Sequence, residues 1–415
     1  MKEIYDKWIE ISLIKRVIVG ILMGILLVTV APNKASGIVI LGDLFVGALK
    51  AVAPILVFFL VVAAVIQHKK GQKTNMKSIV LLYLLGTFLA AIVAVVASFL
   101  FPIELILKTA ESSIAPPENI YGVLKSLLMN LVDNPLNAIL KGNYIGILFW
   151  SVLFGMFLKD GKESTKQAIV DISETVLKVV KTVIEFAPFG IMGLIFNSLR
   201  TSGFSSLLIY GKLILLLLGA MAFVTFVVNP IIAWVMIRQN PFPLIMKCLK
   251  YSGVTAFFTR SSAANIPVNM NLCEELGLDK DVYSVSIPLG ATINMGGAAI
   301  TISIFALSAA HTLGIHIDIL SAILLSILSA ISACGASGVA GGSLLLIPLA
   351  CSLFGIPNEI AMQVVGVGFI IGVIQDSCET ALNSSTDVLF TSLAEYSNWR
   401  KEGRVITFNS NPSYD

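Results

Sequence analysis

The segment that decides the fold lies near the C-terminus and reads GVGFIIGVIQDSCETALNSSTDVLF over residues 366–390. It is apolar enough to cross a membrane, yet it carries three carboxylates, Asp376, Glu379 and Asp387. On a helix that advances about 100° per residue, these three lie within about 80° of one another. Charged side chains at membrane depth are costly and mark ligand or ion sites, so this helix is expected to line a binding site.

The same stripe carries Thr380 and Asn383, and Gly372 on it leaves room for a ligand or a second backbone. A ladder of polar side chains that only joins helices is the alternative. Such a ladder needs Ser, Thr or Asn rather than three carboxylates. Buried carboxylates in hydrocarbon require a cation, a ligand ammonium group or a bound proton, and one of these is therefore expected.

The composition of the whole chain is that of a helical integral membrane protein. Of its 415 residues, 56% are hydrophobic and 13% are charged, and the mean hydropathy is +0.90. The net charge of +3 is small, and the basic residues lie in short tracts between apolar runs. This pattern indicates topology and excludes nucleic acid as a partner. The five cysteines have no metal-ligand or disulfide spacing, so no transition metal is expected.

Eight apolar runs are long enough to span a bilayer. They cover residues 17–31, 39–66, 78–103, 121–158, 168–199, 207–237, 282–313 and 358–395. The fourth run is interrupted by Asp133, Pro135 and Lys141, so its division stays open. Basic residues follow the even-numbered runs, and the positive-inside rule therefore predicts that both termini face the cytoplasm.

Two further segments, 242–279 and 317–355, are apolar but interrupted near their middles. Each is expected to form two short helices that meet at a tip, at residues 259–265 and 333–342. Paired interrupted segments in the two halves of a carrier point to its substrate site. For the second tip, close helix packing through small residues is the alternative.

The tips differ in chemistry. The first offers Arg260, Ser261 and Ser262, which suit an anionic group such as an amino acid carboxylate. The glycines and alanines of the second offer backbone groups and one hydroxyl, which suits a mobile flap. Between the tips, Asn294 and the glycines after it favour local unwinding that frees carbonyls for a hard cation. A simple glycine kink is the alternative there.

These motifs, in this order, resemble the sodium-coupled glutamate and neutral amino acid transporter family, also called the dicarboxylate/amino acid:cation symporters. The resemblance covers nearly the whole chain and is most specific at residues 260–262, 294–296, 335–341 and 376–387. It implies an all-α polytopic membrane protein with eight transmembrane helices, two re-entrant helical hairpins and the elevator fold of glutamate transporters. It also implies a homotrimer in a bacterial cytoplasmic membrane, co-transported sodium ions and no enzymatic activity.

Within a single membrane domain of residues 1–415, the resemblance implies a trimerisation scaffold and a moving transport core. The scaffold would comprise about 17–66 and part of 121–237. The core would comprise about 78–103 and 242–395, namely a first hairpin at 242–279, a seventh helix at 282–313, a second hairpin at 317–355 and an eighth helix at 358–395.

The resemblance also implies the roles of individual residues. Asp376 would bind the substrate amino group, and Asn383 would lie near the substrate carboxylate. The implied substrate-binding residues are Ser261, Ser262, Ala336, Gly338, Asp376, Glu379, Thr380 and Asn383. The implied sodium-binding residues are Gly290, Thr292, Asn294, Met295, Ala333, Cys334, Ala336, Asn383 and Asp387. Asp387 would contribute its carboxylate, Met295 its nearby sulfur, and most of the others backbone carbonyls.

Departures from the family pattern in three places bear on function. Gly296 and Ala298 stand where the family has an Asp and a Thr, and Gly86-Thr87 stands in place of a Thr-Ser pair. We therefore expect fewer coupled sodium ions than in carriers of acidic amino acids. Glu379 stands where those carriers have an Arg that holds the substrate's side-chain carboxylate.

An acid at position 379 repels a second carboxylate, whereas a small hydroxyl can donate a hydrogen bond to it. The nearest pattern in the family is that of bacterial sodium symporters for serine and threonine. We therefore expect sodium-driven import of L-serine and L-threonine. Alternatives are another small neutral amino acid such as alanine, or a dicarboxylate or acidic amino acid. An ion channel is the rival from a different class, and an intramembrane hydrolase is disfavoured because no His accompanies the Ser and Asp clusters.

Overall fold

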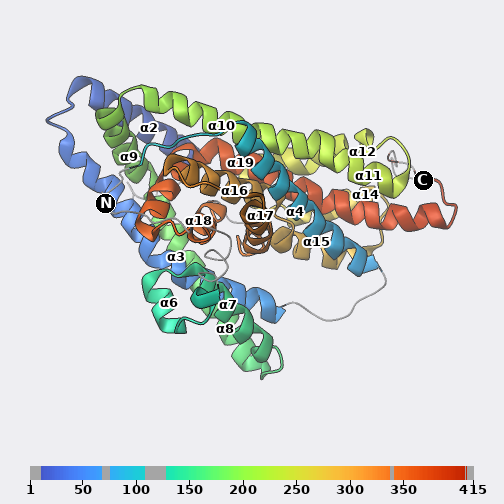
Figure 1. The fold of residues 1–415 in the computed structure, drawn as a ribbon. Helices are drawn as coiled ribbons and strands as arrows, with labels where there is room; N and C mark the ends of the chain where they lie inside the picture. Colours follow the sequence, from blue (N-terminus) through green and yellow to red (C-terminus); the bar gives the residue numbers. More distant parts are fainter. Residues whose placement is uncertain (1–10, 68–74, 108–127, 337–340, 407, 409–415) are drawn as a thin grey trace.

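The computed structural model describes residues 11–67, 75–107, 128–336, 341–406 and 408. Within these residues the chain forms helices and turns and no strand (Figure 1). A helix satisfies its own backbone hydrogen bonds, which a chain in hydrocarbon must do. The predicted all-α class is therefore confirmed for the described part of the chain.

Six helical runs in the described residues are long and apolar enough to cross a membrane. They are α2 (Leu13–Val30), α3 (Val39–Gln67, preceded by η1, Ser36–Ile38), α4 (Asn75–Leu100), α10 (Ser205–Phe223) with η2 (Val224–Val228) and α11 (Asn229–Ile237), α15 (Lys280–Ile293) with α16 (Gly296–Thr312), and α19 (Asn358–Lys401). A seventh is counted if one bent helix pair forms a single span. The polytopic architecture agrees with the sequence, while the count of eight stays a prediction.

The bent pair corresponds to the predicted fifth span at 168–199. The structure divides this run into α8 (Glu163–Glu185) and α9 (Ala187–Ser202), which meet at an angle of 51°. Pro188 lies in the first turn of α9, where its missing N–H costs no helical hydrogen bond. A helix therefore restarts at this proline instead of continuing straight.

The described part of the predicted fourth span at 121–158 is divided into helical residues 128–131, α6 (Pro135–Lys141) and α7 (Tyr144–Leu158). Asn134 caps α6 by accepting from two backbone N–H groups, and Gly142 ends it at φ 66°. The 15 residues of α7 extend about 22 Å, less than the roughly 30 Å of a bilayer's hydrocarbon core. This segment therefore adds no long straight span.

Both segments predicted to be hairpins contain helices on each side of the expected tip, within the described residues. The first hairpin consists of α12 (Phe242–Cys248), η3 (Leu249–Gly253), α13 (Val254–Thr259) and α14 (Ile266–Glu275). The second hairpin consists of α17 (Ile319–Ala333), η4 (Ser343–Leu346) and α18 (Ile347–Ser352). At the first tip, Arg260 adopts the left-handed conformation at φ 52°, which is uncommon for a residue with a side chain.

The predicted unwinding in the seventh run is confirmed. Helix α15 ends at Ile293 and α16 begins at Gly296. Between them, Asn294 (φ −92°, ψ 77°) and Met295 (φ −119°, ψ 50°) leave the helical region altogether. Two consecutive nonhelical residues make a break in the helix rather than a glycine kink.

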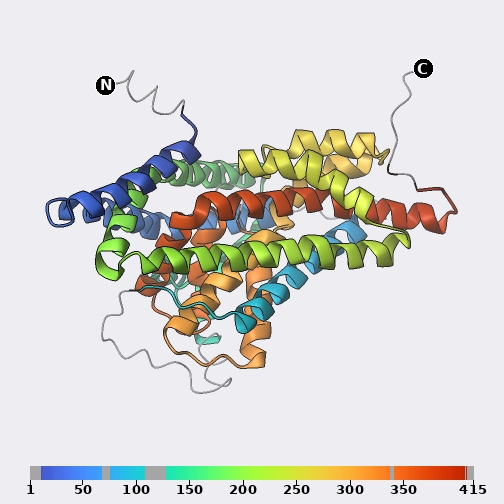
Figure 2. The ribbon, with the colours of Figure 1, turned by 90° about the horizontal axis from the view of Figure 1, so that it is seen from above.

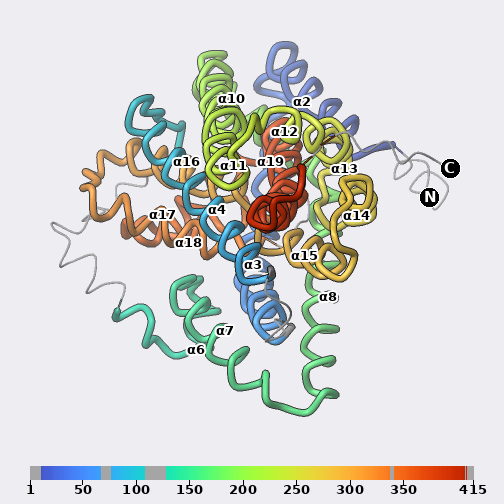
Figure 3. Tube along the Cα trace, turned by 90° about the vertical axis from the view of Figure 1, so that its right-hand side faces the viewer, coloured from blue at the N-terminus to red at the C-terminus, as the bar shows by residue number. Residues whose placement is uncertain are grey.

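Helix α19 lies at the centre of the molecule. In the end-on view it is surrounded by α4, α10 and the helices of the first hairpin (Figure 3). Helices α10 and α11 run along its length (Figure 2), and α16 packs on it closely. A Cβ atom at Gly297 would meet the Glu379 carbonyl oxygen at 2.7 Å, so a glycine is needed at this crossing. The central position explains why the acids of α19 are buried.

A second group of helices lies beside this central assembly. Helix α3 packs against α7, α8 and α9, and α2 packs against α9. Figure 3 shows α7 and α8 projecting away from the helices around α19. The predicted scaffold segments thus lie mostly in this group, whereas α10 packs on α19 and α4, and α11 packs on α19.

Candidate functional site

The predicted polar stripe of α19 is buried as a unit. Asp376, Glu379, Asn383 and Asp387 have relative exposures of 2%, 4%, 3% and 1%. These residues contact groups from both hairpins and from the α15–α16 break, as the bonds below show. Segments distant in the sequence therefore meet on one face of one helix.

Asp376 lies between the two hairpin tips. Arg260 Nε of the first hairpin donates to Asp376 Oδ2 over 2.6 Å. The backbone N–H of Gly341, at the second tip, donates to Oδ1 over 3.1 Å. The sequence predicted that the Arg260 cation suits a ligand anion, but the structure pairs it with a protein carboxylate. Asp376 thus accepts a charge-assisted hydrogen bond from a cationic donor. A bond of the same kind would hold an ammonium group.

Glu379 is surrounded by uncharged donors. Its Oε2 accepts from the hydroxyls of Thr301, over 2.7 Å, and Ser343, over 2.8 Å, and from the amide of Gln375. Gln375 also donates to Thr301 Oγ1 over 2.7 Å. Each donor comes from a different element, namely α16, η4 and α19. The surroundings of Glu379 are thus suited to donors without charge, such as hydroxyl and amide groups.

The sequence did not point to Thr301, Ser343 or Gln375. Gln375 could have been found, because residues four apart on a helix are neighbours and Gln375 precedes Glu379 by one turn. Thr301 and Ser343 carried no local signal. Only the packing of α16 and of the second hairpin on α19 brings their hydroxyls to Glu379.

Asn383 ties α19 to the helix break. Its Oδ1 accepts from the backbone N–H of Gly297 over 2.7 Å, and its Nδ2 lies 3.4 Å from the sulfur of Met295. The first N–H groups of a helix lack partners within the helix, so this bond satisfies one of them for α16. By contrast, the Thr380 hydroxyl donates to its own helix, at the Asp376 carbonyl, over 2.7 Å.

Asp387 has one occupied and one unoccupied carboxylate oxygen. Oδ1 accepts from Asn294 Nδ2 over 2.9 Å, whereas Oδ2 is buried without a hydrogen-bond partner among the described residues. A Cβ atom at Gly290 would lie 2.7 Å from Oδ1, so the backbone of α15 approaches this carboxylate closely. A buried carboxylate oxygen beside backbone at a helix break is a suitable ligand for a hard cation.

The other predicted cation-binding residues gather where the second hairpin meets the same break. Cys334 Sγ lies 3.4 Å from the Ile293 carbonyl oxygen. Ala333, Ala336 and Met295 are buried, whereas Thr292 is exposed and donates its hydroxyl to Leu289. The structure thus brings residues 333–336 close to residues 292–295.

Of the remaining predicted substrate residues, Ser261 and Ser262 lie at the first tip. Ser262 is buried, and its Oγ has no hydrogen-bond partner in the part of the chain that the structure describes. Ser261 Oγ accepts from the backbone N–H of Ala264 over 3.2 Å. Gly338 lies outside the described residues. The first tip also contacts Asp376, because Arg260 of this tip donates to its carboxylate.

The departures at Gly296 and Thr87 face each other. A Cβ atom at Gly296 would meet Ala90 Cβ at 3.4 Å and the Cα atom of Thr87 at 4.0 Å. The Thr87 hydroxyl is buried without a partner in the described segments. A carboxylate at position 296 would therefore point toward α4, and this chain has only hydrogen there.

The site combines buried acids on a central helix with two helical hairpins and a break between α15 and α16. This combination is typical of a polytopic helical carrier. Residues 13–397 match the sodium:dicarboxylate symporter family. The chain is also 59% identical over 403 residues to the serine/threonine transporter SstT of Streptococcus agalactiae serotype III (strain NEM316), and equally to that of serotype Ia (strain A909). Each alignment covers 97% of this chain and 100% of the relative.

This chain therefore belongs to the sodium:dicarboxylate symporter family. The family and both relatives are transporters, so the predicted class of carrier rather than enzyme is confirmed.

Proposed function

We propose that this chain imports L-serine and L-threonine, together with sodium ions, across a bacterial cytoplasmic membrane. The family name supports sodium coupling, and the names of the two full-length relatives support the substrates. The site supports the same choice independently of these names.

One observation carries the proposal: two buried acids one turn apart on α19 accept different kinds of donor. Asp376 accepts from a guanidinium group, and Glu379 accepts from two hydroxyls and an amide. An amino acid with a short hydroxyl side chain offers an ammonium group to Asp376 and a hydroxyl to Glu379. A second carboxylate would instead meet repulsion at Glu379.

In this proposal, the substrate carboxylate lies near Asn383 and the first tip, where the buried Ser262 and its neighbour Ser261 offer hydroxyl and backbone groups. Thr380 lines the same face of α19. The second tip covers the substrate with Ala336 and Gly338. The bonds of Arg260 and Gly341 to Asp376, one from each hairpin, support these assignments.

Sodium is a co-transported substrate in this proposal. One ion would take the unpartnered Oδ2 of Asp387 together with backbone carbonyls of Gly290, Asn294 and Asn383. A second ion would take carbonyls of four residues beside the sulfur of Met295. These four residues are Thr292, Ala333, Cys334 and Ala336. Oxygen ligands of this kind suit a hard cation.

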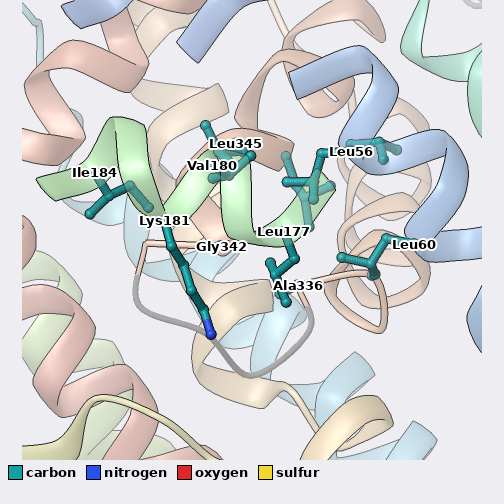
Figure 4. Close-up of a pocket in the computed structure, with 12 residues that line it drawn as sticks. Leu56, Leu60, Leu177, Val180, Lys181, Ile184, Ala336, Gly342 and Leu345 are labelled. Atoms are coloured by element: carbon teal, nitrogen blue, oxygen red, sulfur yellow. The ribbon is translucent and has the colours of Figure 1, made fainter. Parts of the chain in front are cut away.

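We further propose elevator-type transport, in which the helices around α19 move as a core against α2, α3 and α7–α9 within a homotrimer. The second hairpin meets this scaffold at a largely apolar pocket (Figure 4). Its lining includes Leu56 and Leu60 from α3, Leu177, Val180, Lys181 and Ile184 from α8, and Ala336, Gly342 and Leu345 from the hairpin. Apolar contacts have no preferred direction, so such a surface suits sliding.

We also propose that both termini face the cytoplasm, because basic residues are concentrated in the loops on that side.

Competition in proteoliposomes tests the substrate. Uptake of labelled L-serine would be measured in sodium with unlabelled serine, threonine, alanine or aspartate in excess. Serine and threonine should inhibit most strongly, because each donates a hydroxyl to Glu379. Equal inhibition by alanine would show that the hydroxyl is not recognised, and strong inhibition by aspartate would show that Glu379 does not reject a carboxylate.

A further inference from the structure

The second arm of the second hairpin binds both acids at once. Gly341 donates its backbone N–H to Asp376, and Ser343, two residues further on, donates its hydroxyl to Glu379. Ser343 is 1% exposed, so its bond is shielded from water. The described part of this hairpin therefore makes direct contact with both groups proposed to hold the substrate.

We propose that Ser343 is a specificity-determining residue whose hydroxyl is the internal counterpart of the substrate hydroxyl. It bonds to Glu379 when no substrate hydroxyl does so, and it gives way when one arrives. This inference rests on the proposed function. The side chain of Ser343 is chemically the side chain of free serine, so both present the same donor to the same acceptor.

The donors around Glu379 are not equivalent. Thr301 and Gln375 belong to α16 and α19, which pack directly on each other. Ser343 belongs to the hairpin. Each carboxylate oxygen accepts at about two lone-pair positions, whereas three donors converge on Oε2. A ligand hydroxyl that bonds to Oε2 therefore competes with these three donors, and the hairpin donor is the one that can withdraw without disturbing α16 or α19.

Two functional consequences follow. Without a substrate hydroxyl, the bond from Ser343 to Glu379 stabilises the hairpin in contact with α19. A carrier returning without substrate would depend on this bond, whereas a carrier that exchanges serine for serine would not. With substrate present, Ser343 competes with the ligand hydroxyl and so lowers the affinity for serine relative to alanine.

The test uses the full-length protein in proteoliposomes and the variant Ser343→Ala. Net sodium-driven serine uptake should fall about tenfold, since a hydrogen bond to a charged group is lost. Exchange of labelled external serine for internal serine should stay within about twofold of wild type. In competition assays, the inhibition constant of unlabelled serine should fall, while that of alanine should not change. Ser343→Thr, which keeps a hydroxyl, should restore net uptake.

Ser352→Ala is the matched control. This serine lies on α18 of the same arm and donates to the Leu349 carbonyl of its own helix, so both modes of transport should be unaffected. If Ser343→Ala does not fold, Ser343→Cys, whose thiol is a weak donor, replaces it with the same expectations.

A parallel change in net uptake and exchange would overturn the inference, as would no change in either. An unchanged ratio of the serine and alanine inhibition constants would overturn it too. These outcomes differ from failure of the proposed function itself, which would appear as wild-type protein without sodium-dependent serine uptake.

Discussion

Asn294, in the break between α15 and α16, donates its side-chain amide to Oδ1 of Asp387 on α19 over 2.9 Å. The bond fixes the carboxylate beside the unwound backbone while Oδ2 has no hydrogen-bond partner among the described residues. A cation at Oδ2 would supply the missing partner and would be bound only while α15, α16 and α19 keep this arrangement. In the proposed function, sodium binding would thereby depend on the shape of the site.

The variant Asp387→Asn removes the charge and keeps an oxygen. The sodium concentration for half-maximal serine uptake should rise about tenfold or more, since a charged ligand to the cation is lost. The control is Glu395→Gln, which changes another buried acid of α19, one that accepts from the Asp279 backbone N–H over 3.0 Å. An unchanged sodium response in Asp387→Asn would remove Asp387 from the cation site.

The variant Asp376→Asn tests recognition of the substrate amino group. A charge-assisted hydrogen bond contributes about 1.5–3 kcal/mol, so serine affinity measured by titration calorimetry in sodium should fall at least about tenfold. Stabilisation by sodium, measured as the rise in melting temperature on adding the salt, should persist because Asp387 is intact. Serine affinity equal to that of the wild type would show that Asp376 does not hold the ammonium group.

Much of this site could be predicted from residues 366–390 alone. Helical periodicity places Asp376, Glu379 and Asp387 on one stripe, and the cost of burying them indicates ligands. The Asn294 break and the hairpin tips were also visible, because polar and small residues interrupt apolar runs there. Each of these signals depends only on residues close together in the sequence, so it can be recognised without knowing how distant segments pack.

Pairings between distant segments could not be predicted in this way. Arg260 and Asp376 are separated by 116 residues, and no pattern in either segment shows that they meet. The hydroxyls of Thr301 and Ser343 lie in runs that read as ordinary helix packing. The bend between α8 and α9 was missed because hydropathy measures length and composition, not direction.

The variant Glu379→Arg tests selectivity. A planar fork of donors in place of an acceptor should abolish most serine uptake and favour a substrate with a second carboxylate, so labelled aspartate uptake should appear. Glu379→Gln is the matched control, because it removes the acid without adding a cation, and aspartate uptake should not appear in it. Wild-type serine uptake with continued rejection of aspartate in Glu379→Arg would place residue 379 outside the pocket.

The variant Gly297→Ala tests the close crossing of α16 over α19. Its Cβ atom would meet the backbone of Glu379 at 2.7 and 2.9 Å, and overpacking of this kind costs about 1–3 kcal/mol. The melting temperature of the purified protein should fall. In the control Gly211→Ala, on α10, the new Cβ atom meets nothing within 4 Å, so stability should be unchanged or slightly raised. Equal melting temperatures for both variants would contradict the packing described at Glu379.

Sodium-driven accumulation of serine tests the central claim most directly. Proteoliposomes containing the purified chain would receive labelled L-serine at equal concentration inside and outside, with sodium outside and choline inside. Serine should accumulate above its external concentration and should leave again when a sodium ionophore collapses the gradient. Equilibration without accumulation, or accumulation that is unchanged when choline replaces the external sodium, would contradict sodium-coupled transport of serine.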